Sequence, residues 1–506
     1  MNTPPLVRLS ALLALVLAGC APGAIVAPPS AADGPDSGAT FTILHLNDVY
    51  EITPVEGGQA GGLARVAGLR QQLLSEGAPV LTVLAGDFLS PSALGTARVD
   101  GERLAGRQMV AVLNALGLDV AAVGNHEFDV SEDAFHARIA EADFPLVSAN
   151  AVTPSGARFS DVPPRLVVPL AVAPGDTVRV GIASVVIPSN DEPWVRYLDA
   201  DSTLRAEVAR LDTEADVVVG LTHLSFPDDA AAAATVPGLD MVLGGHEHEN
   251  VRAYRGPRLV PLLKADGNAR TVYVHRVRLD RATGAVTMTS ELVPITPETP
   301  EDPAVAAVVA EWVELASAGF RADGFEPDRV AVVTTEALDG RESTIRTRPA
   351  RLGALIAEAF RQTAEAEVGL FNGGSVRVDD VLPAGPFTEY DAIRVLPFGG
   401  TVVSVEMPGA LLARVLDQGV ANAGTGGFLQ TSGIDRDGEQ WRIAGAPLDP
   451  DRIYTVATSD FLASGRETGL DYFDAEVNPD VMNLVAHGDV RRALLNELVR
   501  VYGTAE

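Results

Sequence analysis

The sequence predicts an α/β fold with a layered sheet, and three observations support this prediction. Apolar runs of strand length alternate with amphipathic helical patterns between residues 41 and 245. Several of these runs end in Asp, Asn or His, and open α/β sheets bind their ligands at the carboxyl ends of strands. The chain has 506 residues, 47% of them hydrophobic, which suffices for two or three domains with a sizeable core.

Strand-like and helix-like segments follow one another along the first half of the chain. Strands are expected at 41–46, 79–85, 118–123, 178–187, 216–221 and 239–243, and helices at 61–76, at 104–116 and from Ser131, whose hydroxyl can cap a helix. Residues 270–279 and 285–292 alternate apolar and polar side chains, so they are expected to be antiparallel strands. His45 lies inside the first strand, where a structural role is expected.

A proline-rich linker at 294–303 separates this part from a second predicted unit. A short amphipathic helix is expected at 304–315. The second unit begins near Val330, and its expected elements are helices at 351–365 and 409–418 and strands at 367–371, 401–405 and 453–458.

The first twenty residues predict an export signal. Arg8 supplies a basic start and residues 9–17 an apolar core, which a plain signal peptide also explains. The ending, Leu17-Ala18-Gly19-Cys20, is similar to the lipobox of bacterial lipoproteins, which implies that Cys20 is lipidated. A membrane-spanning anchor fits less well, because the apolar run is shorter than the ~20 residues that a span requires. We expect a signal at 1–19, a flexible tether at 20–40, and an exported protein anchored to a membrane and facing the periplasm or the cell exterior.

The charge of the chain limits the classes of ligand. The net charge is −30, which argues against binding to duplex nucleic acid, since such proteins present a basic face. The overall charge therefore does not attract an anionic substrate. Phosphate binding would depend on metal ions and on a few arginines at the site. Lys264 is the only lysine, and Cys20 is the only cysteine, which excludes an intrachain disulfide. No obligate protein partner is indicated.

Polar side chains end five of the predicted strands. They are Asp48, Asp87, Asn125 with His126, His223, and His246 with His248. Carboxylate, amide and imidazole without a thiolate suit Mn²⁺, Zn²⁺, Mg²⁺ or Fe. Two ions about 3.5–4 Å apart can clamp both oxygens of an in-line displacement and ionise a bound water. Each residue alone also has a structural explanation, such as a capping Asp or a core His, but their joint occurrence in this order favours a metal centre.

This order of motifs resembles the calcineurin-like metallophosphoesterases and, more narrowly, the 5′-nucleotidase / UDP-sugar hydrolase family. The matching motifs are Asn47-Asp48-Val49-Tyr50, Gly86-Asp87, Gly124-Asn125-His126-Glu127, His223 and Gly245-His246-Glu247-His248. The resemblance extends over about residues 41–505. It implies a four-layer αββα metallophosphoesterase sandwich at 41–295, a linker and helix at 296–329, and a separate C-terminal α/β substrate-binding domain at 330–506.

The resemblance also implies roles for the motif residues and two divalent metal ions as cofactors. Asp87 would bridge the two ions, Asp48 and His248 would hold one, and Asn125, His223 and His246 would hold the other. His126 would face the phosphate without binding metal, oriented by Asp129. A cation beside a developing trianion stabilises it, and a protonated His can help the leaving oxygen depart.

Tyr50 departs from the pattern of the family, which has a His at this position. A phenol ionises near pH 10, so it is a poor ligand for Zn²⁺ or Mn²⁺ without help. It could bind Fe³⁺, or it could leave the position to water. The occupancy of the first site and the identity of its metal are both left open by this residue.

In the second domain, loops follow the predicted strands and match further motifs of the same family. By resemblance, Asn372 and the arginines Arg346, Arg348 and Arg377 hold phosphate and ribose, with Arg346 and Arg348 as rivals for one position. Phe398 and Phe461 would stack the nucleobase, which is worth about 1–3 kcal/mol, although core packing is the ordinary explanation for each Phe taken singly. Glu467 stands near the place where the family often has an Asp on the ribose hydroxyls, so the sugar preference could differ.

The expected function is therefore that of a lipid-anchored enzyme that releases phosphate from nucleoside 5′-monophosphates by a dinuclear metal hydroxide mechanism. Rotation between the two domains could carry the substrate to the metals. The alternatives are hydrolysis of a 2′,3′-cyclic nucleotide, of a UDP-sugar or of a sulfur compound, and a non-catalytic lipoprotein that binds nucleotide or metal. Tyr50 is the best support for the last alternative, and the retained ligand set argues against it.

Overall fold

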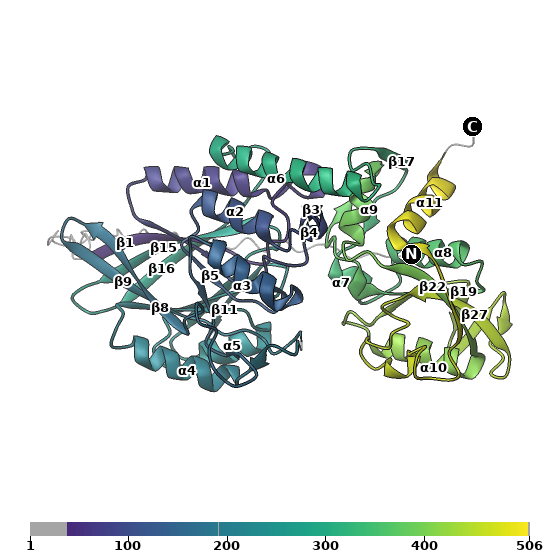
Figure 1. The fold of residues 1–506 in the computed structure, drawn as a ribbon. Coiled ribbons are helices and arrows are strands. Elements are labelled where there is room, and N and C mark those ends of the chain that lie inside the picture. Colours follow the sequence, from purple (N-terminus) through teal and green to yellow (C-terminus); the bar gives the residue numbers. More distant parts are fainter. Residues whose placement is uncertain (1–37, 191, 504–506) are drawn as a thin grey trace, which may run out of the picture. The chain divides into compact units, whose positions relative to one another are not determined.

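The computed structural model describes residues 38–190 and 192–503, which form a two-domain α/β fold with mixed sheets, as predicted (Figure 1). The predicted signal peptide, Cys20 and most of the tether lie outside this range. Their assignment remains a prediction from the sequence.

Two six-stranded sheets form the N-terminal domain. In spatial order the first contains β16 (Val286–Pro294), β15 (Thr271–Asp280), β1 (Gly38–Leu46), β2 (Val80–Leu84), β5 (Val120–Ala122) and β6 (Leu146–Val147). The second contains β13 (Val251–Arg255), β14 (Val260–Lys264), β12 (Met241–Gly244), β11 (Val217–Thr222), β9 (Asp176–Ala183) and β8 (Arg165–Ala173). β1, β2, β5 and β6 are parallel, and β15 pairs antiparallel with both β1 and β16. The predicted antiparallel pair is therefore confirmed.

Helices cover the outer face of each sheet, which gives four layers (Figure 1). Helices α1 (Leu63–Ser75), α2 (Arg107–Leu116), α3 (Glu132–Glu141) and α6 (Pro303–Ala322) belong to the first sheet, and α4 (Ala200–Leu211) and α5 (Phe226–Thr235) to the second. Ser131 caps α3, because its hydroxyl accepts a hydrogen bond from the N–H of Ala134 at 3.3 Å, as expected. Short pairs β3 (Arg98–Val99) with β4 (Glu102–Arg103) and β7 (Ala151–Val152) with β10 (Arg196–Tyr197) complete the domain.

The helix α6 has the length and apolar composition of a membrane span, alone among the helices of the described ranges. It packs against α1 and α2, and Asp302 caps its first turn by accepting from Ala304 N–H at 2.9 Å. The packing buries part of the helix, including Val305, Ala316 and Phe320.

The main core lies between the two sheets. Ile43 and Leu81 of the first sheet and Ile182 and Val219 of the second belong to one buried cluster. Helices cover the other faces, so both faces of the central strands are buried. This explains why these strands are continuous apolar runs in the sequence and do not alternate with polar residues.

A five-stranded sheet organises the C-terminal domain. Its spatial order is β23 (Leu429–Ser432), β19 (Val368–Asn372), β27 (Ile453–Ser459), β22 (Thr401–Pro408) and β28 (Met482–Asp489). It is packed by α8 (Arg351–Thr363), α10 (Gly409–Ala421) and α11 (Val490–Tyr502), and α11 also contacts α9 (Glu389–Val395). The smaller elements are β17 (Val330–Thr334), β18 (Leu338–Asp339), α7 (Glu342–Ile345), β20 (Val381–Leu382), β21 (Gly385–Thr388), β24 (Ile434–Asp437), β25 (Gln440–Ile443) and β26 (Ala446–Pro447).

His45 and His275 are buried together in the sandwich, with stacked rings 5.7 Å apart. Burial lowers the pKa of His45 to about 3 and lowers the pKa of His275 as well. An unfolded chain binds protons at both residues below about pH 6.5, whereas the folded chain does not. The stability that depends on these neutral histidines is therefore fully present above about pH 6.5 and is lost as the pH falls.

We expect His45→Leu to reduce this acid sensitivity. Between about pH 6 and pH 4, the free energy of unfolding should fall less steeply, by about 1.4 kcal/mol per pH unit, than in the wild type. Urea unfolding at several pH values measures the slope. His136→Leu, at an exposed position, is the control. Equal slopes in the wild type and His45→Leu would show that the buried imidazole of His45 does not cause the loss of stability in acid.

Candidate active site

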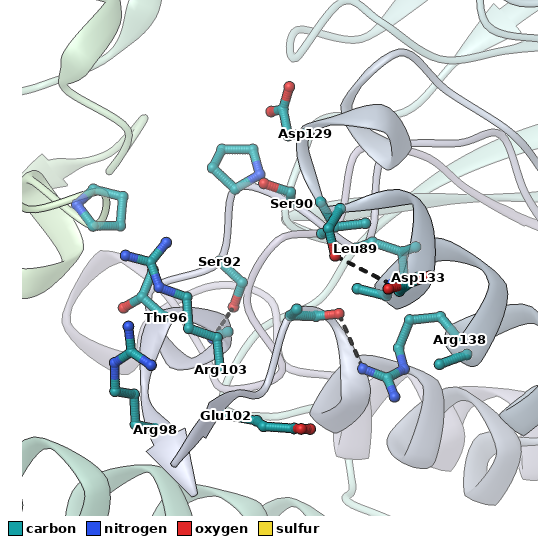
Figure 2. Close-up of a pocket in the computed structure, with 18 of the residues that line it drawn as sticks. Leu89, Ser90, Ser92, Thr96, Arg98, Glu102, Arg103, Asp129, Asp133 and Arg138 are labelled. Atoms are coloured by element: carbon teal, nitrogen blue, oxygen red, sulfur yellow. Dashed lines mark hydrogen bonds between the residues drawn. The ribbon is translucent and has the colours of Figure 1, made fainter. Parts of the chain in front are cut away.

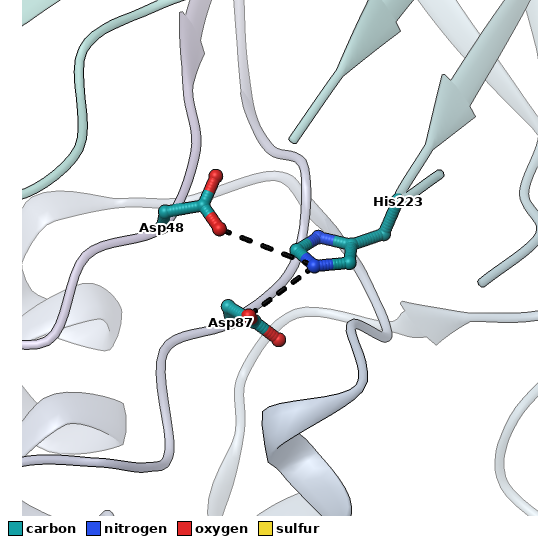
Figure 3. Close-up of side chains that lie close together, drawn as sticks. All are labelled: Asp48, Asp87 and His223. Atoms are coloured by element: carbon teal, nitrogen blue, oxygen red, sulfur yellow. Dashed lines mark ion pairs between the residues drawn. The ribbon is translucent and has the colours of Figure 1, made fainter. Parts of the chain in front are cut away.

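Three loops bring Asp48, Asp87 and His223 into one buried cluster. Asp48 follows β1, Asp87 follows β2 and His223 follows β11, so the carboxyl ends of strands in both sheets contribute. One ligand atom from each residue lies within 4.8 Å of the others. Figure 3 shows both carboxylates directed at the imidazole of His223.

The imidazole of His223 is fixed by a backbone bond. Nδ1 donates to the carbonyl of Ala85 at 2.7 Å, so Nε2 is the nitrogen that faces the cluster. There burial is outweighed by the charges of Asp87 and Asp48, which raise the pKa of the imidazole to about 9. Nε2 lies 3.2 Å from Asp87 Oδ2 and 3.1 Å from Asn125 Oδ1. These three atoms form one group of potential ligands.

A second group lies on the other side of Asp87 Oδ2. Tyr50 Oη is 3.1 Å from this oxygen and 3.1 Å from His248 Nε2, which in turn lies 3.8 Å from Asp48 Oδ1. The carboxylate of Asp87 therefore stands between the two groups. Asp87 would therefore help to hold both ions if each group binds one.

The donor set fits a pair of metal ions. Asp48 and Asp87, both buried, form ion pairs only with histidines among the residues that the structure describes. Burial raises the pKa of Asp48 to about 6, so the nearby histidines only partly offset the loss of solvation of its charged form. Nitrogen and oxygen lone pairs that face one another are stabilised when a cation lies between them. Two divalent ions would supply that charge, held by the side chains named above.

His246 enters the cluster by a strained backbone. Its φ is 82°, and its N–H donates to Asp48 Oδ2 at 2.9 Å. Its ring lies edge-on to His223, with centroids 5.4 Å apart. Asp48 and Asp87 also have positive φ values, of 52° and 58°. Such backbone strain is commonly found at functional sites.

Glycines precede the ligand residues because the loops touch. A Cβ at Gly124 would lie 2.1 Å from Asp87 Oδ1, and a Cβ at Gly245 would lie 2.2 Å from the carbonyl of Ala85. A side chain at either position would push the loops apart. The Gly-Asn-His and Gly-His motifs of the sequence therefore have a packing cause.

Glu127 holds the Asp87 loop and was given no role from the sequence. Its buried carboxylate accepts from the N–H groups of Asp87 at 2.9 Å, Phe88 at 2.7 Å and Gly124 at 2.5 Å. Burial, together with the charge of Asp87, raises the pKa of Glu127 to about 7. Spacing along the motif does not reveal this role, because the bonded groups come from two loops.

Lys264 holds the histidine loops in a similar way. Its ammonium donates to the carbonyls of Leu224 and Gly245, both at 2.7 Å. It also pairs with Asp229 at 2.8 Å and with Glu247. Leu224 follows His223 and Gly245 precedes His246, so one buried cation fixes both ligand segments. The single lysine of the chain was the available sequence signal.

His126 and Asp129 lie beside the cluster. His126 Nδ1 is 2.6 Å from Asp129 Oδ2, and Nε2 is 3.0 Å from Nη2 of Arg377 in the C-terminal domain. Since the guanidinium can only donate, Nε2 is the acceptor and Nδ1 carries the proton donated to Asp129. Asn190 also donates to Asp129 and accepts from the amide of Asn125 at 3.3 Å. Asn190 was missed, because nothing in its local sequence marks it.

A cavity of about 730 Å³ joins these residues to the C-terminal domain. It is lined by Asn125, His126, Asp129 and His246 and also by Arg346, Asn372, Arg377, Phe398, Phe461 and Glu467. Its size is typical of small-molecule sites. Asn372 Nδ2 donates to Glu467 Oε2 at 2.7 Å. Two distant stretches of the sequence thus share one cavity.

The two rival arginines differ in position. Arg346 lines the cavity and pairs with Glu342, whose Oε1 also accepts from Arg377 Nη1 at 3.5 Å. Arg348 is exposed, bonds to Thr344 Oγ1 at 3.4 Å, and is not among the residues lining this cavity. The geometry therefore favours Arg346 over Arg348 as a ligand-binding group.

A neighbouring cavity of about 700 Å³ shares Asp129 and Phe398 with the first. Figure 2 shows Arg98 and Arg103, from the β3–β4 hairpin, across this space from Asp133. Nothing in the sequence pattern predicted this cavity. It provides room beside the first cavity for a larger molecule.

Asp379 of the C-terminal domain orients His248. Its Oδ2 accepts from Nδ1 at 2.7 Å, and its Oδ1 accepts from Glu342 N–H at 2.8 Å. This carboxylate fixes the tautomer that presents Nε2 to the cluster. It was also missed, because it lies far along the chain from the histidine that it contacts.

We expect Asp379→Asn to weaken metal binding about 10–100-fold at the site that includes His248. The side-chain amide of asparagine is neutral, so it no longer stabilises a proton on Nδ1 of His248. Calorimetric titration of metal-free protein with Zn²⁺ measures the effect. Asp266→Asn, which removes a nearby carboxylate that does not contact His248, is the control. Equal affinities for Asp379→Asn and the wild type would show that Asp379 does not orient the ligand.

Comparison with known proteins identifies both halves of the chain. Residues 41–250 match the family model of calcineurin-like phosphoesterases, and residues 329–475 match that of the 5′-nucleotidase C-terminal domain. The 5′-nucleotidase of Homo sapiens is 28% identical, over 88% of this chain and 87% of its own. That of Vibrio cholerae is 25% identical over 96% of both chains. The structure of a 5′-nucleotidase precursor from Thermus thermophilus superposes with a TM-score of 0.76 at 24% identity, covering 92% of this chain and 97% of that one.

Proposed function

We propose that this chain, which belongs to the calcineurin-like phosphoesterases with a 5′-nucleotidase C-terminal domain and is a metal-dependent phosphoesterase, releases phosphate from nucleoside 5′-monophosphates. The observation that supports this substrate is the shared cavity. It brings two of the expected metal ligands, Asn125 and His246, together with His126 and with Phe398, Phe461, Arg346 and Arg377 of the second domain. Relatives named 5′-nucleotidase point to the same substrate class.

Different side chains act on the phosphate and on the nucleobase. Two divalent ions, held by the Asp48, Asp87 and His223 cluster, would activate water and neutralise charge on the phosphoryl oxygens. Arg377 and Arg346 place positive charge beside the same phosphate. His126, with Nδ1 bonded to Asp129, presents Nε2 where it can hold a proton for the leaving oxygen. Phe398 and Phe461 hold the base away from the reacting centre.

A second candidate is hydrolysis of a larger nucleotide ester, such as a nucleoside diphosphate conjugate. The neighbouring cavity favours it, because a group beyond the reacting phosphate would have room beside Asp129. Arg98 and Arg103 would complement additional negative charge there. Release of product from UDP-glucose in parallel with AMP distinguishes the two candidates.

The phenylalanines provide the test of the nucleotide assignment. We expect Phe398→Ala and Phe461→Ala each to weaken AMP hydrolysis by about 1–3 kcal/mol in kcat/KM, because one stacking face is lost. Hydrolysis of p-nitrophenyl phosphate, which has no nucleobase, should change far less. Phe360→Leu, a buried residue of α8 that does not line the cavity, is the control for general damage to the domain. Equal losses on both substrates would overturn the assignment.

We also propose that the protein is exported and held at a membrane through Cys20. The Leu17-Ala18-Gly19-Cys20 ending supports this location. Metabolic labelling with a fatty acid should mark the wild type and not Cys20→Ser. Labelling of Cys20→Ser at the wild-type level would contradict it.

A further inference from the structure

The position of Tyr50 is fixed by the backbone around it. Its side chain is 4% exposed, and its N–H donates to Asn268 Oδ1 at 2.9 Å. The N–H of Asn268 donates in turn to the carbonyl of Asp48 at 2.7 Å, and the N–H of Val49 donates to the carbonyl of Asp87 at 2.9 Å. Segment 48–50 is therefore tied to the Asp87 loop, and the phenol is directed into the cluster.

The phenol oxygen lies at the spacing of a metal ligand. It is 3.1 Å from Asp87 Oδ2 and 3.1 Å from His248 Nε2. Two atoms that bind one ion at about 2.1 Å and at right angles to each other are about 3 Å apart. Because Nδ1 of His248 bonds to Asp379, Nε2 is the nitrogen that offers its lone pair when an ion displaces its proton. The phenol oxygen, the carboxylate oxygen and the imidazole nitrogen therefore lie close enough to one another to bind one ion together.

The two ligand groups differ in charge. With Tyr50 included, the group around His248 offers three oxygens that are anionic when they bind metal, from Asp48, Asp87 and Tyr50. The group around His223 offers the amide of Asn125 and imidazoles, and it shares the charge of Asp87. Hard anionic oxygens favour a small ion of high charge, and neutral imidazole and amide suit a divalent ion.

We infer that Tyr50 is a metal ligand and that the site it completes, with Asp48, Asp87 and His248, selects a ferric ion beside a divalent ion in the other site. This rests on the proposed phosphohydrolase site and specifies one of its two metals. When the ion binds, the phenolic O–H bond breaks, the proton leaves to solvent, and an oxygen lone pair forms the bond to iron. The iron enters and stays as Fe³⁺, so no electron is transferred.

Visible absorption and resonance Raman spectra test the inference without turnover. The full chain is stripped with chelator and loaded with one equivalent of Fe³⁺, supplied as the citrate complex, and one of Zn²⁺. We expect one iron per chain, a visible charge-transfer band and enhanced tyrosinate ring modes. Tyr50→Phe should lose the band and the modes. Tyr390→Phe, which alters another tyrosine that bonds to Glu51, should keep both.

Metal content makes each outcome decisive. Loss of iron from Tyr50→Phe with retention of Zn²⁺ supports the inference, because it shows that ferric binding requires the phenol. Absence of the band from wild-type protein that holds one iron, failure of the wild type to bind Fe³⁺, or an unchanged band per iron in Tyr50→Phe would overturn it. Phosphate release from AMP with divalent ions alone is measured separately. It can succeed when the iron assignment fails, which distinguishes this inference from the proposed function.

Discussion

Replacing His126 with asparagine is expected to lower kcat for AMP hydrolysis by about 10²–10⁴-fold, the usual contribution of a positioned proton donor. His126 lines the cavity, its Nε2 lies 3.0 Å from Arg377 Nη2, and its Nδ1 bonds to Asp129 at 2.6 Å. Asparagine retains polarity but cannot hold a proton at that place. KM should change little, because the arginines and phenylalanines that bind the nucleotide remain.

The same variant separates an enzyme from a protein that only binds nucleotide. His136→Asn, an exposed change on α3, is the control and should retain full activity. Steady-state kinetics give kcat and KM, and calorimetry gives AMP affinity. A loss of AMP affinity with an unchanged kcat in His126→Asn would contradict the role assigned to this imidazole.

Replacing Lys264 with methionine is expected to cost about 3–5 kcal/mol of stability, because it leaves buried charge without its partner. Burial opposes the charge on Lys264, but Asp229 and Glu247 outweigh it and raise the pKa of the ammonium. Lys264 and Asp229 have no exposed side-chain surface, so water cannot replace the lost interaction. The loops that carry His223 and His246 should also loosen, which weakens metal binding.

A triple variant is the matched control for Lys264. Lys264→Met combined with Asp229→Asn and Glu247→Gln removes all three charges and should recover part of the lost stability. Urea unfolding gives the free energies, and calorimetry gives the affinity for Zn²⁺. If the single variant were as stable as the wild type, the buried charge network would have no structural importance.

Much of the fold could be predicted, because the strands that build the centre are apolar on both faces. Segments 118–123 and 216–221 correspond to β5 and β11, and the predicted helix at 351–365 corresponds to α8. The helix α5 was missed, although Ser225 caps it and Pro227 stands in its first turn. Its alanine-rich sequence lacks the apolar periodicity on which the helix predictions depended.

The ligand residues were predictable because each follows a strand within a short motif. The residues that position them were not, because their contacts join distant parts of the chain. Asp379 contacts His248 at a separation of 131 residues, and Lys264 reaches the carbonyl of Leu224 at a separation of 40. The choice between Arg346 and Arg348 also required the structure, since sequence spacing does not show which guanidinium faces the cavity.

Phosphate release from AMP tests the account most directly. The full chain is assayed as purified, after removal of metal by chelator, and after adding back Mn²⁺, Zn²⁺, Mg²⁺ or Fe singly. We expect chelation to abolish release and at least one ion to restore it. Release that continues undiminished in chelator, or no release from AMP with any ion, would contradict the assignment as a metal-dependent nucleotide phosphohydrolase.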